Sequence, residues 1–139
     1  MNIKIDVDAD ALIRDVKAWI NNSEDIVAEE MDICAHKIQR TAVELAPIDT
    51  GELRRSIAIS GGGLEYEIGT NLYYAYWMEE GTGPHVITGN PWLFWPGASH
   101  PVRSVMHPGT NAYRYMQRSL EANTQDLDSR IADALVSKF

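Results

Sequence analysis

The positions of glycine and proline most constrain what this chain can fold into. All ten glycines lie between Gly51 and Gly109, and all six prolines lie between Pro47 and Pro108. Because these residues destabilise a helix interior by roughly 1 and 3 kcal/mol, long helices are expected only before and after this segment. The chain is therefore predicted to have a helical start, a middle of strands and loops, and a helical end.

The first 46 residues are predicted to contain one short strand followed by two helices. Apolar and polar residues alternate over residues 1–7, which is typical of a half-buried strand. Asp8 can cap a helix that starts near Ala9. The pair Asn21–Asn22 interrupts the helical spacing, so a second helix is expected up to Leu45. The apolar face of that second helix comprises Val27, Met31, Cys34, Ile38, Thr41 or Ala42, and Leu45.

The middle of the chain has the signals of short strands. Gly61 to Gly63 separate two alternating segments, residues 56–60 and 64–69, which predicts a β-hairpin. The apolar run Tyr73–Met78 is predicted to be a third strand. Shorter strand candidates are residues 85–88, 92–95 and 101–106.

Helical spacing returns from Asn111 onward, and the polar residues 123–126 are expected to divide this region into two helices. The predicted fold class is α+β, with a small, curved, mostly antiparallel sheet flanked by N-terminal and C-terminal helices. We expect a single domain over residues 1–139. Its parts would be a strand plus helices (1–46), sheet and loops (47–109), and C-terminal helices (110–139).

Charge and composition exclude several classes of protein. The formal net charge is −8, which argues against a broad nucleic-acid-binding surface, because such a surface needs clustered Lys and Arg. A single cysteine, Cys34, excludes an internal disulfide and a Cys₄ or Cys₂His₂ zinc site. No apolar run approaches the ~20 residues that span a bilayer, and the acidic, alternating N-terminus is unlike a signal peptide. These features predict a soluble protein made in the cytoplasm.

The first motif is APIDTGELRRSI, residues Ala46–Ile57. Pro47 ends the preceding helix, and Gly51 permits a positive φ. Asp49 can accept a hydrogen bond from the backbone N–H of Gly51 or Glu52. Local chemistry favours a helix-to-strand corner with solvated arginines. The alternative is that one arginine forms an ion pair across a subunit interface, where Arg is enriched.

Two further motifs follow. In YYAYWMEEGTG, residues Tyr73–Gly83, the adjacent Glu79 and Glu80 would face opposite sides of a strand, which is wrong for a shared acid–base site. In HPGT, residues His107–Thr110, Thr110 or Asn111 can cap the last helical region. No serine stands in a nucleophile elbow, and Cys34 on an apolar helix face is expected to be inert.

In this order the motifs resemble the tail-component family of long-tailed bacteriophages and prophages, which includes head–tail joining and tail-completion (neck) proteins. The corresponding residues here are Ala46 to Gly51, Leu53, Arg54, Ser56 and Ile57 in the first motif, Gly69, Thr70, Tyr74, Ala75, Glu79, Gly81 and Thr82 in the second, and His107 to Thr110 with Tyr115 in the third.

The resemblance implies a structural protein of the virion neck or tail, made in the host cytoplasm, with no catalytic activity, no cofactor and no membrane association. It implies part of a head–tail connector or tail-completion ring, built from copies of the chain, with a hexamer favoured, and bound to other neck or tail proteins. DNA would pass through the channel without specific binding, and the acidic charge would keep it from sticking. The candidate interface residues are Asp49, Thr50, Arg54, Tyr74, Trp77, Glu79, Thr82, His107 and Tyr115.

Three alternatives or refinements remain open at this point. Arg54 and Glu79 are hypothesised to pair across the subunit boundary. A monomeric tail-assembly chaperone or binding module would share the fold but leave the finished particle. A small metal-dependent hydrolase would use His85, His100 or His107 with Glu79 or Glu80, although no residue spacing supports a metal site.

Overall fold

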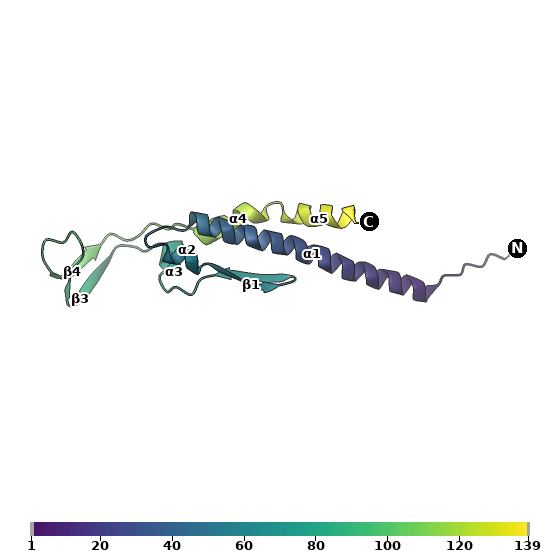
Figure 1. The fold of residues 1–139 in the computed structure, drawn as a ribbon, viewed down its shortest axis with the longest axis horizontal. Coiled ribbons are helices and arrows are strands. Elements are labelled where there is room, and N and C mark those ends of the chain that lie inside the picture. The colour runs from purple at the N-terminus through teal and green to yellow at the C-terminus, as the bar shows by residue number, and fades with distance from the viewer. Residues whose placement is uncertain (1, 139) are drawn as a thin grey trace.

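The computed structural model describes residues 2–138 and is elongated, with one long helix as its axis (Figure 1). The elements in chain order are α1 (Ala9–Leu45), α2 (Glu52–Ser56), β1 (Ala58–Gly62), β2 (Glu65–Gly69), α3 (Ala75–Glu80), β3 (His85–Leu93), β4 (Val102–His107), α4 (Tyr115–Thr124) and α5 (Leu127–Ser137). The predicted helical start, mixed middle and helical end are confirmed.

The N-terminal helix α1 is continuous, so the predicted break at Asn21–Asn22 is wrong. Asparagine costs a helix interior less than ~0.7 kcal/mol relative to alanine, which is too little to interrupt a helix that propagates on both sides. Its start is as predicted, because the Asp8 carboxylate accepts a hydrogen bond from the Ala11 N–H at 3.0 Å. At the usual rise per residue α1 is roughly 55 Å long.

The strand predicted at residues 1–7 is also wrong, as far as the structure describes it. Met1 lies outside the described residues, and residues 2–8 form no strand. Ile3 and Ile5 are 82% and 85% exposed. Alternation alone does not make a strand when no neighbouring strand offers backbone hydrogen-bond partners.

The strands form two separate antiparallel hairpins. The β1–β2 hairpin is as predicted and pairs Ala58 with Gly69 around the glycine turn. The β3–β4 hairpin pairs His85 with His107, and its register shifts between Thr88 and Leu93. The α+β class and the antiparallel pairing are confirmed, but the strands make two two-stranded sheets and not one.

The apolar run Tyr73–Met78, predicted to be a strand, instead leads into the short helix α3. Ala75 is buried and Met78 packs against the core, whereas Tyr76 and Trp77 are exposed. Residues three apart share a helix face, so this arrangement buries the small and flexible residues and leaves the large aromatic rings outside. A short apolar run cannot be assigned to strand or helix by its periodicity.

The C-terminal region forms two helices that lie alongside α1 (Figure 1). Their separation after Thr124 was predicted, but the first begins at Tyr115 and not near Asn111. The contact with α1 is partly polar. The thiol of Cys34 donates to the Asn123 carbonyl, the Asn123 amide donates to Thr41, and Arg130 pairs with Glu30 at 2.8 Å. The buried position predicted for Cys34 is confirmed, and burial raises the pKa of its thiol.

The core lies where the end of α1 meets α2, α3 and the start of α4. Its fully buried members are Ala42, Ala46, Leu53, Ile57, Ala75 and Tyr115. Tyr115 is 1% exposed, and its hydroxyl donates a hydrogen bond to the Ala75 carbonyl at 3.1 Å. This one side chain therefore ties α4 to α3.

We expect the stability of the fold to fall at alkaline pH because of Tyr115. Burial, with a smaller contribution from the Glu79 charge, raises its pKa to about 12, against about 10 in an unfolded chain. The protonated phenol therefore stabilises the folded state below pH ~10, and this stabilisation is lost as the pH rises toward ~12. In the Tyr115→Phe variant, the free energy of unfolding, measured by urea denaturation, should change less with pH over that range.

The matched control is Tyr73→Phe, because Tyr73 is 80% exposed. This variant should keep the alkaline decline of the wild-type protein. An unchanged decline in Tyr115→Phe would show that another group causes it.

Candidate subunit interface

The residues of all three sequence motifs meet at one place, around the C-terminal end of α1 and the N-terminal end of α4. Backbone carbonyls at the end of a helix and N–H groups at its start have no partner inside the helix. Side chains from α2 and α3 supply those partners here.

Arg54 of α2 caps the C-terminal end of α1. Its Nε donates to the Ala46 carbonyl and its Nη2 to the Glu44 carbonyl, both at 2.9 Å. A guanidinium is well placed there, because the helix dipole puts partial negative charge at this end. Arg54 is therefore held within its own chain.

Glu79 of α3 caps the N-terminal end of α4. Its two carboxylate oxygens accept hydrogen bonds from the Met116 N–H at 2.8 Å and the Gln117 N–H at 3.0 Å. The residue in the N-cap position itself, Arg114, has φ 53° and makes no side-chain cap bond. Glu79 of α3 thus caps α4, a role that a residue next to the start of the helix usually has.

The first motif turns the chain between α1 and α2 through Thr50 and Gly51. Gly51 has φ +80°, which agrees with the positive φ that glycine was expected to permit here. The Thr50 hydroxyl accepts from the Glu52 N–H at 3.3 Å, so the cap predicted for Asp49 is made by its neighbour. Further along, the hydroxyls of Ser56 and Thr70 lie 2.6 Å apart and join α2 to the end of β2.

The second and third motifs are joined by a short backbone bridge. The backbone N–H of each threonine, Thr82 and Thr110, donates to the carbonyl of the other, at 2.9 and 3.0 Å. Thr110 was predicted to cap the last helical region, but it lies in this bridge and does not cap α4. Gly81 has φ +75°, and a Cβ there would lie 2.7 Å from the Thr110 carbonyl oxygen. The bridge therefore requires glycine at this position.

The candidate interface residues fall into two groups, those that hold the α-helices together and those that line surface hollows. In the first group, the side chains of Arg54, Glu79 and Tyr115 bond to other elements of the same chain. Tyr115 is a core residue within the single chain, and its expected place in an interface stays a prediction. The ion pair hypothesised between Arg54 and Glu79 of neighbouring subunits stays a prediction, with an intramolecular role now described for each.

The other candidate interface residues line two hollows on the surface. Asp49, Thr50 and Tyr74 line a groove of about 410 Å³ at the corner between α1 and α2. Partial desolvation and the nearby Glu52 raise the pKa of the Tyr74 hydroxyl. Trp77, Thr82 and His107 line a second hollow of about 480 Å³ at the base of the β3–β4 hairpin.

The histidines of the second hollow are stacked. The rings of His85 and His107 are 5.0 Å apart at 30°. His85 Nδ1 donates to the Gly83 carbonyl, whereas His107 Nδ1 accepts from the Gly109 N–H. The neutral His107 ring therefore carries its proton on Nε2, which leaves that nitrogen without a free lone pair for a metal. Among residues 2–138, no three His, Cys, Asp or Glu side chains lie close enough to hold one metal ion.

Two further exposed apolar surfaces lie outside the sequence motifs. One is on the β3–β4 hairpin, and the other is on the N-terminal half of α1. Their exposed members are Val86, Trp92, Phe94, Trp95 and Met106 on the hairpin, and Leu12, Ile13, Val16 and Ile20 on the helix. The available signal was the aromatic run Trp92–Trp95, which has no carboxylate near it in the sequence.

A sequence model of the HK97-gp10-like family, described as "Bacteriophage HK97-gp10, putative tail-component", matches residues 10–81. The chain belongs to this family. The matched segment runs from α1 to just past the end of α3 and contains the first motif and the second as far as Gly81, so the resemblance to phage tail components is confirmed. Neither curated proteins nor solved structures gave a match. Within the described range, no helix is both long and apolar enough to cross a membrane.

We expect Glu79→Gln and Arg54→Met each to lower the free energy of unfolding by about 1–2 kcal/mol, because each removes a partner of a helix end. The control is Glu80→Gln. Glu80 is exposed and lies 3.5 Å from Arg114, so its loss should change stability by less than ~0.5 kcal/mol. Urea denaturation measures all three variants.

A charge exchange separates this capping role from an ion pair between subunits. Arg54→Glu combined with Glu79→Arg places the wrong charge at both helix ends, so the double variant should be at least as unstable as either single one. Restored stability or restored assembly in the double variant would contradict the capping role and support the pairing hypothesis.

Proposed function

We propose that this tail component assembles with itself into a closed ring at the head–tail junction, with six subunits favoured. The observation that carries the proposal is the distribution of apolar surface on an elongated subunit. Large apolar side chains are exposed at both ends of the molecule, away from the core. Contiguous apolar surface of this kind marks contact sites between proteins.

The two ends differ in structure, so a contact between them can repeat head to tail. A hairpin of one copy that docks on the helix half of the next copy leaves one free hairpin and one free helix half at the two ends of the pair. A repeating contact between different surfaces closes into a ring when its rotation permits. A ring of such subunits suits a channel through which DNA passes.

The proposed partners are other copies of the chain and the neighbouring neck or tail proteins. The grooves at the α1–α2 corner and at the hairpin base are proposed to take part, through Asp49, Thr50, Tyr74, Trp77, Thr82 and His107. Carboxylates concentrate on α1, as in Glu24, Asp25 and Glu29. Like charge on a channel wall would keep DNA from adhering.

Native mass spectrometry across a concentration series tests self-assembly. We expect one discrete closed oligomer, with a mass of six chains, that dissociates to monomer on dilution without a ladder of higher species. A monomer at every concentration, or an open ladder of sizes, would contradict a self-assembling ring.

The presence of the chain in finished particles tests its place in the virion. A structural component should be detected in purified particles in a fixed ratio to the other tail proteins, by quantitative mass spectrometry. An assembly chaperone would be present in infected cells and absent from the particles.

A further inference from the structure

We infer that the β3–β4 hairpin of one subunit packs on the N-terminal half of α1 of a second copy. This inference rests on the proposed self-assembly and names the two surfaces that would form its contact. We call the hairpin with its loop, residues 85–107, the arm, and residues 9–29 of α1 the helix segment.

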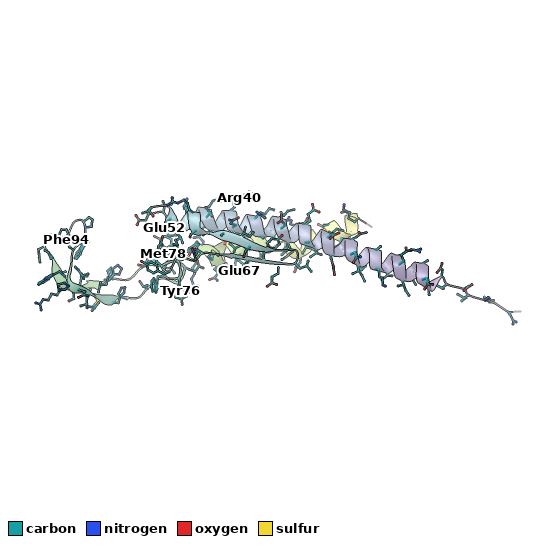
Figure 2. All side chains as sticks on the ribbon, turned by 60° about the horizontal axis from the view of Figure 1, so that its bottom comes forward. Arg40, Glu52, Glu67, Tyr76, Met78 and Phe94 are labelled. Carbon is teal, nitrogen blue, oxygen red and sulfur yellow. The ribbon has the colours of Figure 1, made fainter. Side chains whose placement is uncertain are left out.

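The arm is an apolar element that the body of its own chain does not cover. In the part of the chain that the structure describes, β3 and β4 pack extensively only against each other. The opposed pair Val86 and Met106 lies on one face of the hairpin and is 58% and 64% exposed. Phe94, in the loop, is 68% exposed and lies far from Glu52 and Met78 of the junction (Figure 2). An isolated two-stranded hairpin is marginally stable in water, so the arm gains most from a covering partner.

The start of the helix segment is the second uncovered surface, whereas its later turns, where Asp25, Ile26 and Glu29 line a hollow with Lys138, lie beside α5. The start of α1 extends past the end of α5 and past the β1–β2 hairpin (Figure 1). Leu12 and Val16 are one turn apart on the same face, and they are 55% and 47% exposed. Ile13, on the same side, is 50% exposed. An apolar stripe of this spacing is typical of a helix face that packs against another element.

The charges of the two surfaces are complementary. The sequence contains no Asp or Glu between Glu80 and Glu121, and the arm contains one full charge, Arg103, with three histidines. The Arg103 guanidinium lies 5.1 Å from the centre of the Trp92 ring, so its positive charge sits within the apolar patch. In the helix segment, Asp10 and Asp15 balance Arg14 and Lys17, and the negative excess comes from Glu24, Asp25 and Glu29 in its later turns. Complementary charge favours this pairing over arm against arm, which would bring two arginines together.

A contact between the arm and the helix segment has to join two copies of the chain. The arm projects from one end of the molecule and the helix segment ends at the other (Figure 1), so one chain cannot bring them together. Each subunit would offer its arm to one neighbour and its helix segment to the next. That is the heterologous arrangement from which closed rings are built.

A mixing experiment with two full-length variants tests this pairing. The arm variant is Phe94→Ser with Met106→Thr, and the helix variant is Leu12→Gln with Val16→Gln. All four side chains are exposed, and the replacements suit a loop, a strand and a helix. Each variant alone should lose all species above monomer at a concentration where the wild-type chain is fully assembled.

An equimolar mixture should form a one-to-one dimer and nothing larger in native mass spectrometry. The arm variant keeps an intact helix segment and the helix variant keeps an intact arm, so a single productive contact is available to each pair. The matched control is Tyr76→Ser with Val136→Ser, which removes two apolar side chains of 69% and 75% exposure outside both surfaces. This control should assemble as the wild type does, and circular dichroism should show all variants folded.

The outcomes separate this inference from the proposed function. If the wild-type chain assembles and either surface variant still assembles fully, the pairing is wrong while self-assembly stands, and the unaffected surface faces another tail protein. If both variants are monomeric but the mixture forms no dimer, the two surfaces do not meet each other, and the pairing is also wrong. A wild-type chain that is monomeric at every concentration would overturn both.

Discussion

The body of this protein depends on two helix ends that are capped by charges from other elements. Arg54 neutralises the last carbonyls of α1, and Glu79 satisfies the first N–H groups of α4. Each charge has the sign that the helix dipole favours. Because Arg54 belongs to α2 and Glu79 to α3, the same bonds fix the two short helices against the two long ones. The buried Tyr115 packs in the core beside Ala75 and donates a hydrogen bond to its carbonyl.

These contacts explain what the family motifs do in the structure. Thr50, Gly51, Arg54 and Ser56 turn and fasten the chain after α1, and Gly81 with the Thr82–Thr110 bridge fastens the base of the arm. These motif residues are therefore engaged inside the chain, and two exposed apolar surfaces lie outside the motifs.

Sequence reasoning succeeded where a local rule is strong and failed where two local rules compete. The Asp8 cap, the glycine-turn hairpin and the separation of the C-terminal helices follow from single strong signals. The segment Tyr73–Met78 is short and apolar, and only its packing against Tyr115 and the core selects a helix. The Asn21–Asn22 pair was too weak a signal to end a helix. For the candidate interface, the motifs indicated the residues around the ends of α1 and α4, but they did not indicate that Arg54, Glu79 and Tyr115 bond to other elements of the same chain.

The sequence by itself determined where long helices can exist, because glycine and proline are confined to the middle of the chain. It also determined the family, through short motifs in a fixed order. Only the tertiary structure decided which charges serve as helix caps, because the partners of Glu79 lie almost forty residues further along the chain. Tertiary structure likewise decided which apolar residues are covered. Periodicity shows that a face is apolar, but whether that face is buried depends on how far α4, α5 and the β1–β2 hairpin reach along α1.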